Sequence, residues 1–382
     1  MTAANLEMSN GVCSACISAQ QLAAISRAEW QRREQPFEDL VETLKSKNDS
    51  DYDCLIPVSG GKDSFYQTHL MTEKYGLKPL LVTYHGNNYL PEGDFNRDLM
   101  RQVFDADHLV FGPSVHALKK LNRVGFKLMG DMNWHAHCGI NTYPIQVATS
   151  LKIPLVVWGE TFWDISGMFS PDDFVEFSAR TRHEHALRGF EWFDLVGQEG
   201  LVEKDMMWAK YPSDEEILES GVRGVCIGNY FKWDPHSQTQ LIEEKYGWKG
   251  SDRGFQRTYR KMSNLDDRYE NGAHDLLKFI KFGYGRGSDH ASKDIRTGHM
   301  TRKQGIEMVR KYDHVVSDDL YYWLEYVDME EEEFWMTADT FRDPRVWWIQ
   351  DGEWWKDNIW GEPSSYGKIH LPIERQDKYI RG

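Results

Sequence analysis

Five short apolar runs, separated by stretches long enough to hold helices, most constrain the fold of this 382-residue chain. Between residues 54 and 230 they read CLIPVSGG, KPLLVTYHG, DHLVFG, IPLVVWGE and GVRGVCIGNY. Apolar strands joined by crossover helices are typical of a parallel sheet covered on both faces. The sequence therefore predicts an α/β fold with a doubly wound, mostly parallel sheet.

The same pattern divides the chain into three parts. Residues 1–50 carry Cys13-Ser-Ala-Cys16 and a helical pattern that we expect Pro36 to interrupt. Residues 51–240 hold the predicted sheet, with an aromatic and charged insert from Thr161 to Lys210 that is typical of a lid or an interface. Strand signals are lacking in residues 241–382, which are expected to form a helical C-terminal region.

Charge and hydropathy limit the function classes. The net charge is −15, from 60 acidic and 45 basic residues, which disfavours nucleic acid as a partner. The first residues lack the pattern of a signal peptide, and no apolar run approaches the roughly 18 residues of a membrane span. Five scattered cysteines do not form a disulfide framework. We expect a cytoplasmic protein without membrane insertion.

The first apolar run ends in Ser59-Gly-Gly-Lys-Asp-Ser64, a turn between a strand and a helix. Neither the Walker A pattern nor G-x-G-x-x-G following a strand occurs in the chain. Gly60 and Gly61 allow positive φ and close approach of the backbone to a ligand. Lys62 adds a positive charge, and Asp63 could cap amides or bind magnesium. The turn is expected to hold phosphate, although an ordinary glycine turn before a helix is the alternative.

Other polar residues follow the predicted strands where ligands of open α/β sheets gather. Val82, Thr83 and Tyr84 end the second strand, and Gly159 and Glu160 end the strand IPLVVWGE, with Asp164 soon after. A carboxylate at this rim could hold magnesium or orient a nucleophile. Glu160 and Asp164 could equally be a cap and an ordinary loop charge.

The SGGKDS turn resembles the signature of the PP-loop ATP pyrophosphatases, the adenine nucleotide alpha hydrolase group. Longer stretches resemble one branch of that group, the N-acetyl sugar amidotransferases of bacterial surface-polysaccharide and nonulosonic acid biosynthesis. The resemblance runs in order from about residue 11 to residue 320. It is carried by YDCLIPVSGGKDS, LNRVGF, HCGI, KIPLVVWGE and, most specifically, KFGYGRGSDHASKDIRTGHMTR.

The resemblance implies an ATP-dependent amidotransferase of lipopolysaccharide O-antigen or related surface-glycan biosynthesis. It would adenylate the amide oxygen of an N-acetyl group on a nucleotide-activated sugar, expected to be a UDP-sugar. Ammonia from a separate glutaminase partner would then displace AMP and leave an acetamidino group. The cofactors would be ATP and Mg²⁺. The implied catalytic residues are Lys62, Asp63, Glu160 and Asp164; the implied ATP-binding residues are Val58, Ser59, Gly60, Gly61, Lys62, Asp63, Ser64, Val82, Thr83, Tyr84 and Gly159.

The Lys281–Lys303 segment holds six Lys or Arg against two Asp and is predicted to be a basic substrate loop. Its arginines are candidates for gripping phosphates of ATP or of the nucleotide-sugar, because guanidinium binds phosphate bidentately. Gly283, Gly285 and Gly287 are typical of a flexible closing loop. A solvated basic loop is the alternative. The expected substrate-binding residues are His137, Cys138, Tyr284, Arg286, Asp289, His290, Arg296 and Arg302.

Cys13 and Cys16 form half of a zinc site. Members of the resembled family often carry an earlier CxxC, which is lacking before Cys13. His135, His137 and Cys138 could complete a Zn²⁺ site only if the N-terminal segment folds back over the sheet edge. Otherwise His137 and Cys138 would line the active site or simply pack.

Gly224-x-Cys226-x-Gly228 has the form of a nucleophile elbow, but no histidine after Cys226 has Glu two residues on. We therefore expect Cys226 to be a buried strand cysteine and ammonia to come from outside. Two other functions stay open: a tRNA-thiolating or lysidine-forming PP-loop enzyme, against which the net charge argues, and a non-catalytic nucleotide-binding subunit. The chain could assemble as a homo-oligomer.

Overall fold

The computed structural model describes residues 7–47, 50–86, 89–159 and 172–380. Its centre is a five-stranded sheet in the order β5-β4-β3-β6-β7, in which every neighbouring pair is parallel. The five apolar runs form these strands, so the predicted α/β fold with a parallel sheet is confirmed. The strands are β3 (Cys54–Pro57), β4 (Pro79–Tyr84), β5 (Asp107–Phe111), β6 (Leu155–Trp158) and β7 (Arg223–Cys226).

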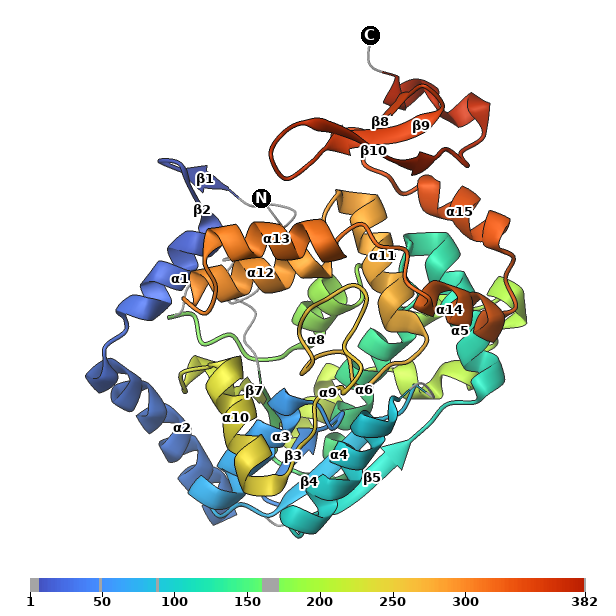
Figure 1. The fold of residues 1–382 in the computed structure, drawn as a ribbon. Coiled ribbons are helices and arrows are strands. Elements are labelled where there is room, and N and C mark those ends of the chain that lie inside the picture. The colour runs from blue at the N-terminus through green and yellow to red at the C-terminus, as the bar shows by residue number, and fades with distance from the viewer. Residues whose placement is uncertain (1–6, 48–49, 87–88, 160–171, 381–382) are drawn as a thin grey trace.

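Helices flank this sheet and precede it (Figure 1). A small hairpin of β1 (Met8–Ser9) and β2 (Val12–Cys13) opens the described chain. The helices of this part are α1 (Ser14–Ala24), α2 (Arg27–Lys47), α3 (Lys62–His69), α4 (Pro91–Val103), α5 (Val115–Met129), α6 (Trp134–Leu151), α8 (Ala179–Thr181), α9 (Asp214–Ser220) and α10 (Pro235–Tyr246).

The expected interruption at Pro36 is wrong, because Pro36 lies inside α2 and the break falls at residues 25–26. A proline removes one backbone hydrogen bond. Phe37, Leu40 and Val41, just after it, are buried in the core and hold this part of the helix in place.

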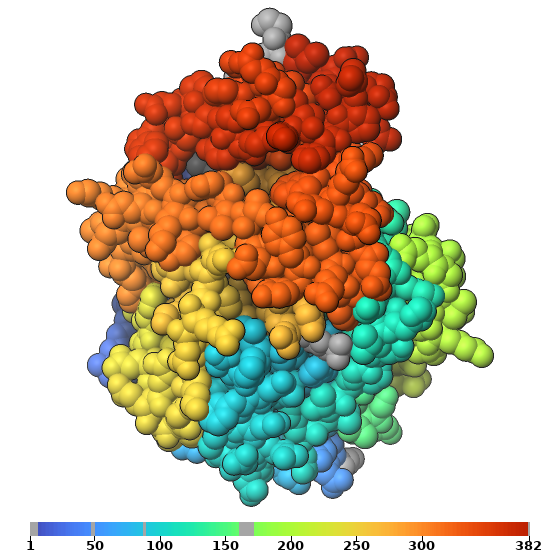
Figure 2. Space-filling view, turned by 45° about the vertical axis from the view of Figure 1, so that its right-hand side comes forward, coloured from blue at the N-terminus to red at the C-terminus, as the bar shows by residue number. Residues whose placement is uncertain are grey.

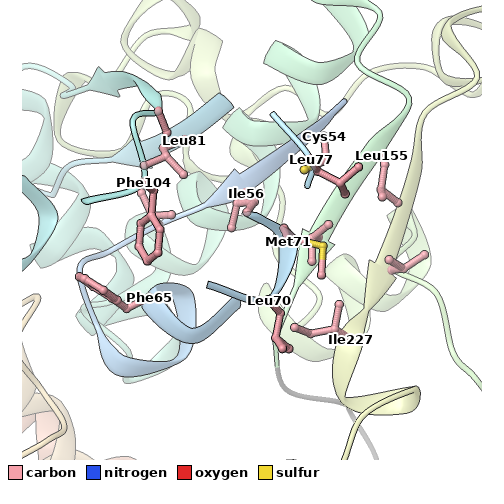
Figure 3. Packing of buried hydrophobic residues seen from close by; sticks show 14 of the residues in the cluster. Cys54, Ile56, Phe65, Leu70, Met71, Leu77, Leu81, Phe104, Leu155 and Ile227 are labelled. Carbon is pink, nitrogen blue, oxygen red and sulfur yellow. The ribbon is translucent and has the colours of Figure 1, made fainter. Parts of the chain in front are cut away.

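The core explains why β3 sits at the centre of the sheet. Cys54 and Ile56 face the cluster that contains Phe65 of α3, whereas Leu55 faces the opposite cluster with Ile145 of α6. This alternation is the period of two that a strand imposes, and both faces are apolar because helices cover both. Figure 3 shows side chains of the strands meeting those of the helical segment that follows the Ser59–Ser64 turn.

The C-terminal region begins with the predicted helices: α11 (Glu270–Phe282), α12 (Arg286–Arg296), α13 (Arg302–Tyr312), α14 (Asp319–Val327) and α15 (Glu331–Asp339). It then forms an antiparallel sheet in the order β10-β9-β8. Its strands are β8 (Trp348–Gln350), β9 (Glu353–Asp357) and β10 (Pro363–Lys368). Figure 2 shows the C-terminal helices lying directly on the sheet domain, with this small sheet above them.

The expectation of a purely helical C-terminal region is therefore wrong. The strands have only three to six residues, too short for a clear periodic signal. Asp351 and Gly352 carried the signal that was missed: both have positive φ, 52° and 77°, and they join β8 to β9. Asp-Gly is a favoured pair for a two-residue hairpin turn.

The insert predicted as a lid or an interface is packed where it is described, over residues 172–210. Leu187, Leu195, Met206 and Trp208 are buried in a cluster with residues of α5 and α6. Trp208 thus serves the core of the sheet domain, whereas Phe193 of the same insert is 59% exposed. In the described part of the chain, no helix is both long and apolar enough to cross a membrane.

Candidate functional site

The Ser59–Ser64 turn lies where the strand order reverses. From β3 the chain builds β4 and β5 on one side and later places β6 and β7 on the other. Open α/β sheets bind ligands at the carboxyl ends of the strands at such a switch point. The turn that joins β3 to α3 is at this point, and its residues also form the first turn of a helix.

Packing against α4 and Trp248 shapes this turn. Gly60 has φ +77°, and a Cβ atom there would lie 2.7 Å from the carbonyl oxygen of Gly93 and 2.8 Å from the Arg97 amide nitrogen. The Trp248 indole donates a hydrogen bond to the Gly60 carbonyl oxygen, at 2.9 Å. Within the turn, the Ser59 hydroxyl accepts from the Gly61 amide at 3.3 Å. The close approach of α4 allows only glycine at position 60.

Lys62 and Asp63 form an ion pair in the first turn of α3. Only 10% of the Lys62 side chain is exposed, so the ammonium group is held beside the turn. Among the described residues, the buried Asp63 Oδ1 has no hydrogen-bond partner. Mg²⁺ at nucleotide sites is held by one or two carboxylates together with phosphates, so this oxygen fits such an ion.

The neighbouring strand ends meet the turn through the backbone. The Val58 amide donates to the Val82 carbonyl oxygen at 2.8 Å, and the Thr83 hydroxyl donates to the Val58 carbonyl oxygen at 2.6 Å. The Val82 side chain is buried in the core. Tyr84 also points into the core, where its hydroxyl lies 3.2 Å from His135 Nδ1. At these positions, only the backbone is therefore open to the adenine base of a nucleotide.

The rim at β6 is described as far as Gly159. A Cβ atom there would lie 2.1 Å from Gln67 Nε2, so glycine lets α3 approach this strand. Glu160 and Asp164, the other predicted carboxylates of this rim, lie outside the described residues.

The C-terminal region approaches α4, which packs on the turn, at Leu265, whose carbonyl oxygen accepts from the Leu90 amide at 3.1 Å. Burial raises the pKa of the Asp266 carboxyl, and the charges of Arg286 and Lys62 act against that rise. Burial lowers the pKa of His290 well below its usual range, and Arg286, Arg260 and Lys62 lower it further. His290 is therefore neutral, and its Nδ1 lies 2.5 Å from the Thr258 hydroxyl. The charge of Lys62 thus acts on the pKa of groups about 200 positions later in the chain.

The predicted basic loop over residues 281–303 is wrong, because most of it is α12 and the start of α13. Gly283 ends α11 with φ +74°, and Gly285 precedes α12. The Asp313 carboxylate accepts from the Gly285 and Ser288 amides, at 2.9 and 2.8 Å. A Cβ atom on Gly287 would lie 2.8 Å from Asp313 Oδ1. These glycines permit close packing rather than a flexible closing motion.

The basic side chains of this segment are separated. Arg286 begins α12, with its Nε 3.2 Å from Asp275 Oδ1, whereas Arg296 ends the helix. Ten residues at about 1.5 Å each place their Cα atoms about 15 Å apart. Arg302 is exposed at the start of α13. These three arginines therefore do not converge on one phosphate group.

Two other predicted substrate residues lie near the start of α12. Asp289 forms an ion pair with Lys278 of α11. The Lys278 ammonium also lies 5.1 Å from the centre of the Tyr284 ring. Burial raises the pKa of Asp289, although a quarter of its side chain is exposed.

The histidines and the cysteine of α6 have different surroundings. His135 is fully buried, with Nε2 2.9 Å from Glu270 Oε1. Burial raises the pKa of the Cys138 thiol to about 12, so Cys138 packs as a neutral side chain. His137 lies beside His274, with ring centres 6.1 Å apart. Of these three side chains, His137 is the one that lies beside a partly exposed residue, His274.

Cys13 and Cys16 lie near Arg296 at the start of α1. Burial by itself would raise the pKa of the Cys13 thiol, but hydrogen bonds to Cys16 and the charge of Arg296 lower it. Among the residues described, no group of three or more His, Cys, Asp or Glu side chains could hold a metal ion. His135, His137 and Cys138 thus do not complete a zinc site with this pair.

Cys226 ends β7 and is 2% exposed, and burial raises the pKa of its thiol to about 12. The prediction of a buried strand cysteine is confirmed.

Sequence reasoning missed Arg97. Its backbone contacts Gly60, and its guanidinium carbon lies 4.6 Å from the centre of the Tyr89 ring. Nη2 is bonded to Asp94 at 2.7 Å, whereas the buried Nε and Nη1 atoms have no hydrogen-bond partner in the described part of the protein. Arg97 lies in an ordinary helix with no motif, so only the fold reveals its place beside the turn.

The fold and this site define an α/β protein with a glycine turn at the switch point of a parallel sheet. Residues 256–359, from just before α11 to beyond β9, match the model of the family described as "LPS biosynthesis protein WbpG-like, C-terminal domain". No curated protein matches the chain. The family match supports a role in lipopolysaccharide biosynthesis.

Proposed function

We propose that this chain is an ATP-dependent amidotransferase that converts the N-acetyl group of a nucleotide-activated sugar to an acetamidino group. The amide oxygen attacks the α-phosphate of ATP and releases pyrophosphate. Ammonia then adds to the adenylated carbon and displaces AMP. Adenylation is needed because an amide oxygen is a poor leaving group and AMP is a good one.

One observation carries this proposal. The region that matches an LPS biosynthesis domain reaches the glycine turn through α4: a Cβ atom on Gly93 would lie 2.1 Å from the Leu265 carbonyl oxygen, and a Cβ atom on Gly60 would lie 2.7 Å from the Gly93 carbonyl oxygen. Two regions far apart in the sequence thus meet at one place. This arrangement suits an enzyme that must bring ATP and a sugar substrate together.

The chain's own residues would have distinct roles. The amides of the Ser59–Ser64 turn and the Lys62 ammonium would hold the β- and γ-phosphates, because the first turn of a helix presents unpaired N–H groups. Asp63 would hold Mg²⁺ through its buried Oδ1, and the ion would neutralise phosphate charge. Neutral His290 could exchange a proton with the substrate amide.

Pyrophosphate release tests the reaction. The purified chain should release pyrophosphate from ATP when ammonium and a UDP-diacetamido sugar are both present, and it should form AMP in equal amount. Unfractionated tRNA serves as the alternative acceptor. Pyrophosphate release that needs tRNA, or ATP binding without turnover on any acceptor, would contradict the proposal.

Ammonia should come from a separate protein. We expect turnover with ammonium salts and none with glutamine alone, since Cys226 is a buried neutral thiol and cannot act as a nucleophile. Cys226→Ala should leave ammonium-dependent turnover within about twofold of the parent chain. Glutamine hydrolysis by the pure chain, lost in Cys226→Ala, would show an internal glutaminase instead.

A further inference from the structure

A polar stripe runs along one face of α11. Glu270, His274, Lys278 and Lys281 recur at spacings of four, four and three residues, which places them on one side of a helix. The opposite side packs Ala273, Leu276, Leu277 and Ile280 into the core formed with α14 and α15. At about 1.5 Å per residue the stripe is about 16 Å long. Glu270 is fully buried, so the part of the stripe open to a ligand runs from His274 to Lys281 and is about 10 Å long.

Positively charged side chains lie at one end of this stripe. We call this cluster, formed by Lys281, Arg188 and Asp131, the Lys281 end. The Lys281 ammonium donates to the Gly130 carbonyl oxygen at 2.7 Å. The next residue, Asp131, is buried and accepts from Arg188 and from His274 Nδ1, the latter at 3.1 Å. Arg188 is 41% exposed, so its guanidinium remains within reach of a ligand. Lys281 and Arg188 are thus two cations around one carboxylate, in a protein whose net charge is −15.

The Lys281 end also has unused donor capacity. An ammonium group has three N–H donors and a guanidinium group has five, more than one carbonyl oxygen and one carboxylate oxygen can accept. His137 faces the same cluster. Its Nδ1 is buried and, among the described residues, has no hydrogen-bond partner. A buried polar atom of this kind is costly unless a ligand or water pairs with it.

The cations therefore form two sets, one at the glycine turn and one at the Lys281 end. Lys62 pairs with Asp63 at the glycine turn, whereas Lys281 and Arg188 bond to Gly130 and Asp131 between α5 and α6. The two sets share no side chain. Two anionic groups could bind at once, one at the glycine turn and one at the Lys281 end.

We propose that Lys281 and Arg188 bind the diphosphate of the second substrate, with His137 as a further hydrogen-bonding group. The identity of this anion as the diphosphate of a nucleotide-sugar rests on the proposed function. The assignment replaces Arg296 and Arg302, which the fold places elsewhere. The α11 stripe then runs from this diphosphate back toward the partly exposed His274.

Binding at this place should depend on pH. Burial lowers the pKa of Lys281 to about 8; Asp131 acts against that shift, and Arg188 and Lys278 add to it. His274 and His137 face the same cluster through Asp131. A diphosphate favours the charged ammonium, so affinity should be highest below pH 8 and fall as the pH rises through it. From pH 7 to pH 9, over which the phosphate ionisation of UDP (pKa about 6) is complete, we expect a severalfold loss.

Calorimetric titration of the full chain with UDP, at low salt and pH 7, tests the site. Lys281→Gln and Arg188→Gln should each weaken UDP binding by roughly tenfold or more, the value of one charge-assisted hydrogen bond. Lys356→Gln is the matched control for Lys281, because Lys356 is also largely buried and donates to a backbone carbonyl oxygen, at 2.6 Å. Arg223→Gln is the control for Arg188, since Arg223 is 45% exposed and also pairs with a carboxylate. Both controls should bind UDP as the parent chain does.

The same titrations separate this site from the ATP site. UDP should bind equally well when a non-hydrolysable ATP analogue is saturating, and Lys62→Ala should weaken binding of the analogue but not of UDP. Absence of UDP binding to the parent chain, competition between UDP and the analogue, or equal loss in Lys356→Gln would overturn the assignment. If one variant does not fold, as judged by its thermal transition, the other decides: a folded Lys281→Gln or Arg188→Gln chain that binds UDP as the parent chain does would exclude the site. If instead Lys62→Ala binds the ATP analogue as tightly as the parent chain does, the result would count against the proposed function.

Discussion

Lys62→Ala should reduce ATP-dependent pyrophosphate release by roughly a thousandfold or more, because one positioned cation at a reacting phosphate contributes several orders of magnitude to such reactions. Only 10% of the Lys62 side chain is exposed and it pairs with Asp63, so the thermal transition should fall, but by far less than the loss of activity would require if unfolding caused it. The measurement is pyrophosphate release under saturating ATP, ammonium and sugar, beside a thermal melt.

Lys74→Ala is the matched control, since Lys74 lies in the same helical segment and also pairs with a carboxylate, Glu34. It should keep full activity. Near-normal turnover by Lys62→Ala would remove the glycine turn from the reaction.

Gly60→Ala should abolish ATP binding and destabilise the protein. A positive φ costs an L-residue about 1–2 kcal/mol, and here the added Cβ would also lie 2.7 Å from the Gly93 carbonyl oxygen. The turn or α4 must move, and either movement disturbs the amides that we propose to hold the phosphates. Binding of an ATP analogue and the midpoint of urea unfolding report the two effects.

Gly76→Ala separates the conformational cost from the contact. Gly76 also has positive φ, +59°, and a Cβ atom there would meet no described atom within 4 Å. It should lose only the conformational part of the stability and bind the analogue normally. Equal behaviour of the two variants would mean that packing against α4 does not shape the turn.

The sheet could be predicted from the sequence because the pattern that indicates each of its strands is local. Each strand is a short apolar run between helical stretches, and β3 buries both faces with Cys54, Leu55 and Ile56. The glycine turn after β3 is also a local pattern, since six adjacent residues carry it. Its function, however, was inferred by resemblance, and the roles of its residues remain predictions.

The tertiary structure decided which distant residues meet. The Lys281–Lys303 segment reads as one basic stretch, yet α12 places Arg286 and Arg296 at opposite ends and the first near Asp275. Its glycines suggested flexibility, but the close contact of Gly287 with Asp313 makes them packing positions. The composition of a segment cannot distinguish a flexible basic loop from a packed helix, because it does not show which residues of the rest of the chain the segment contacts.

The sequence by itself thus determined the parallel sheet, the glycine turn after its first strand and the burial of Cys226, since each depends on neighbours in the chain. Only the fold brought Asp131, Arg188 and Lys281 together and set Leu265 against α4, which packs on the glycine turn. The physical reason is the apolar face of α11. Its burial against α14 and α15 orients the helix, and that orientation directs its polar stripe toward residues about 90 to 150 positions away in the chain.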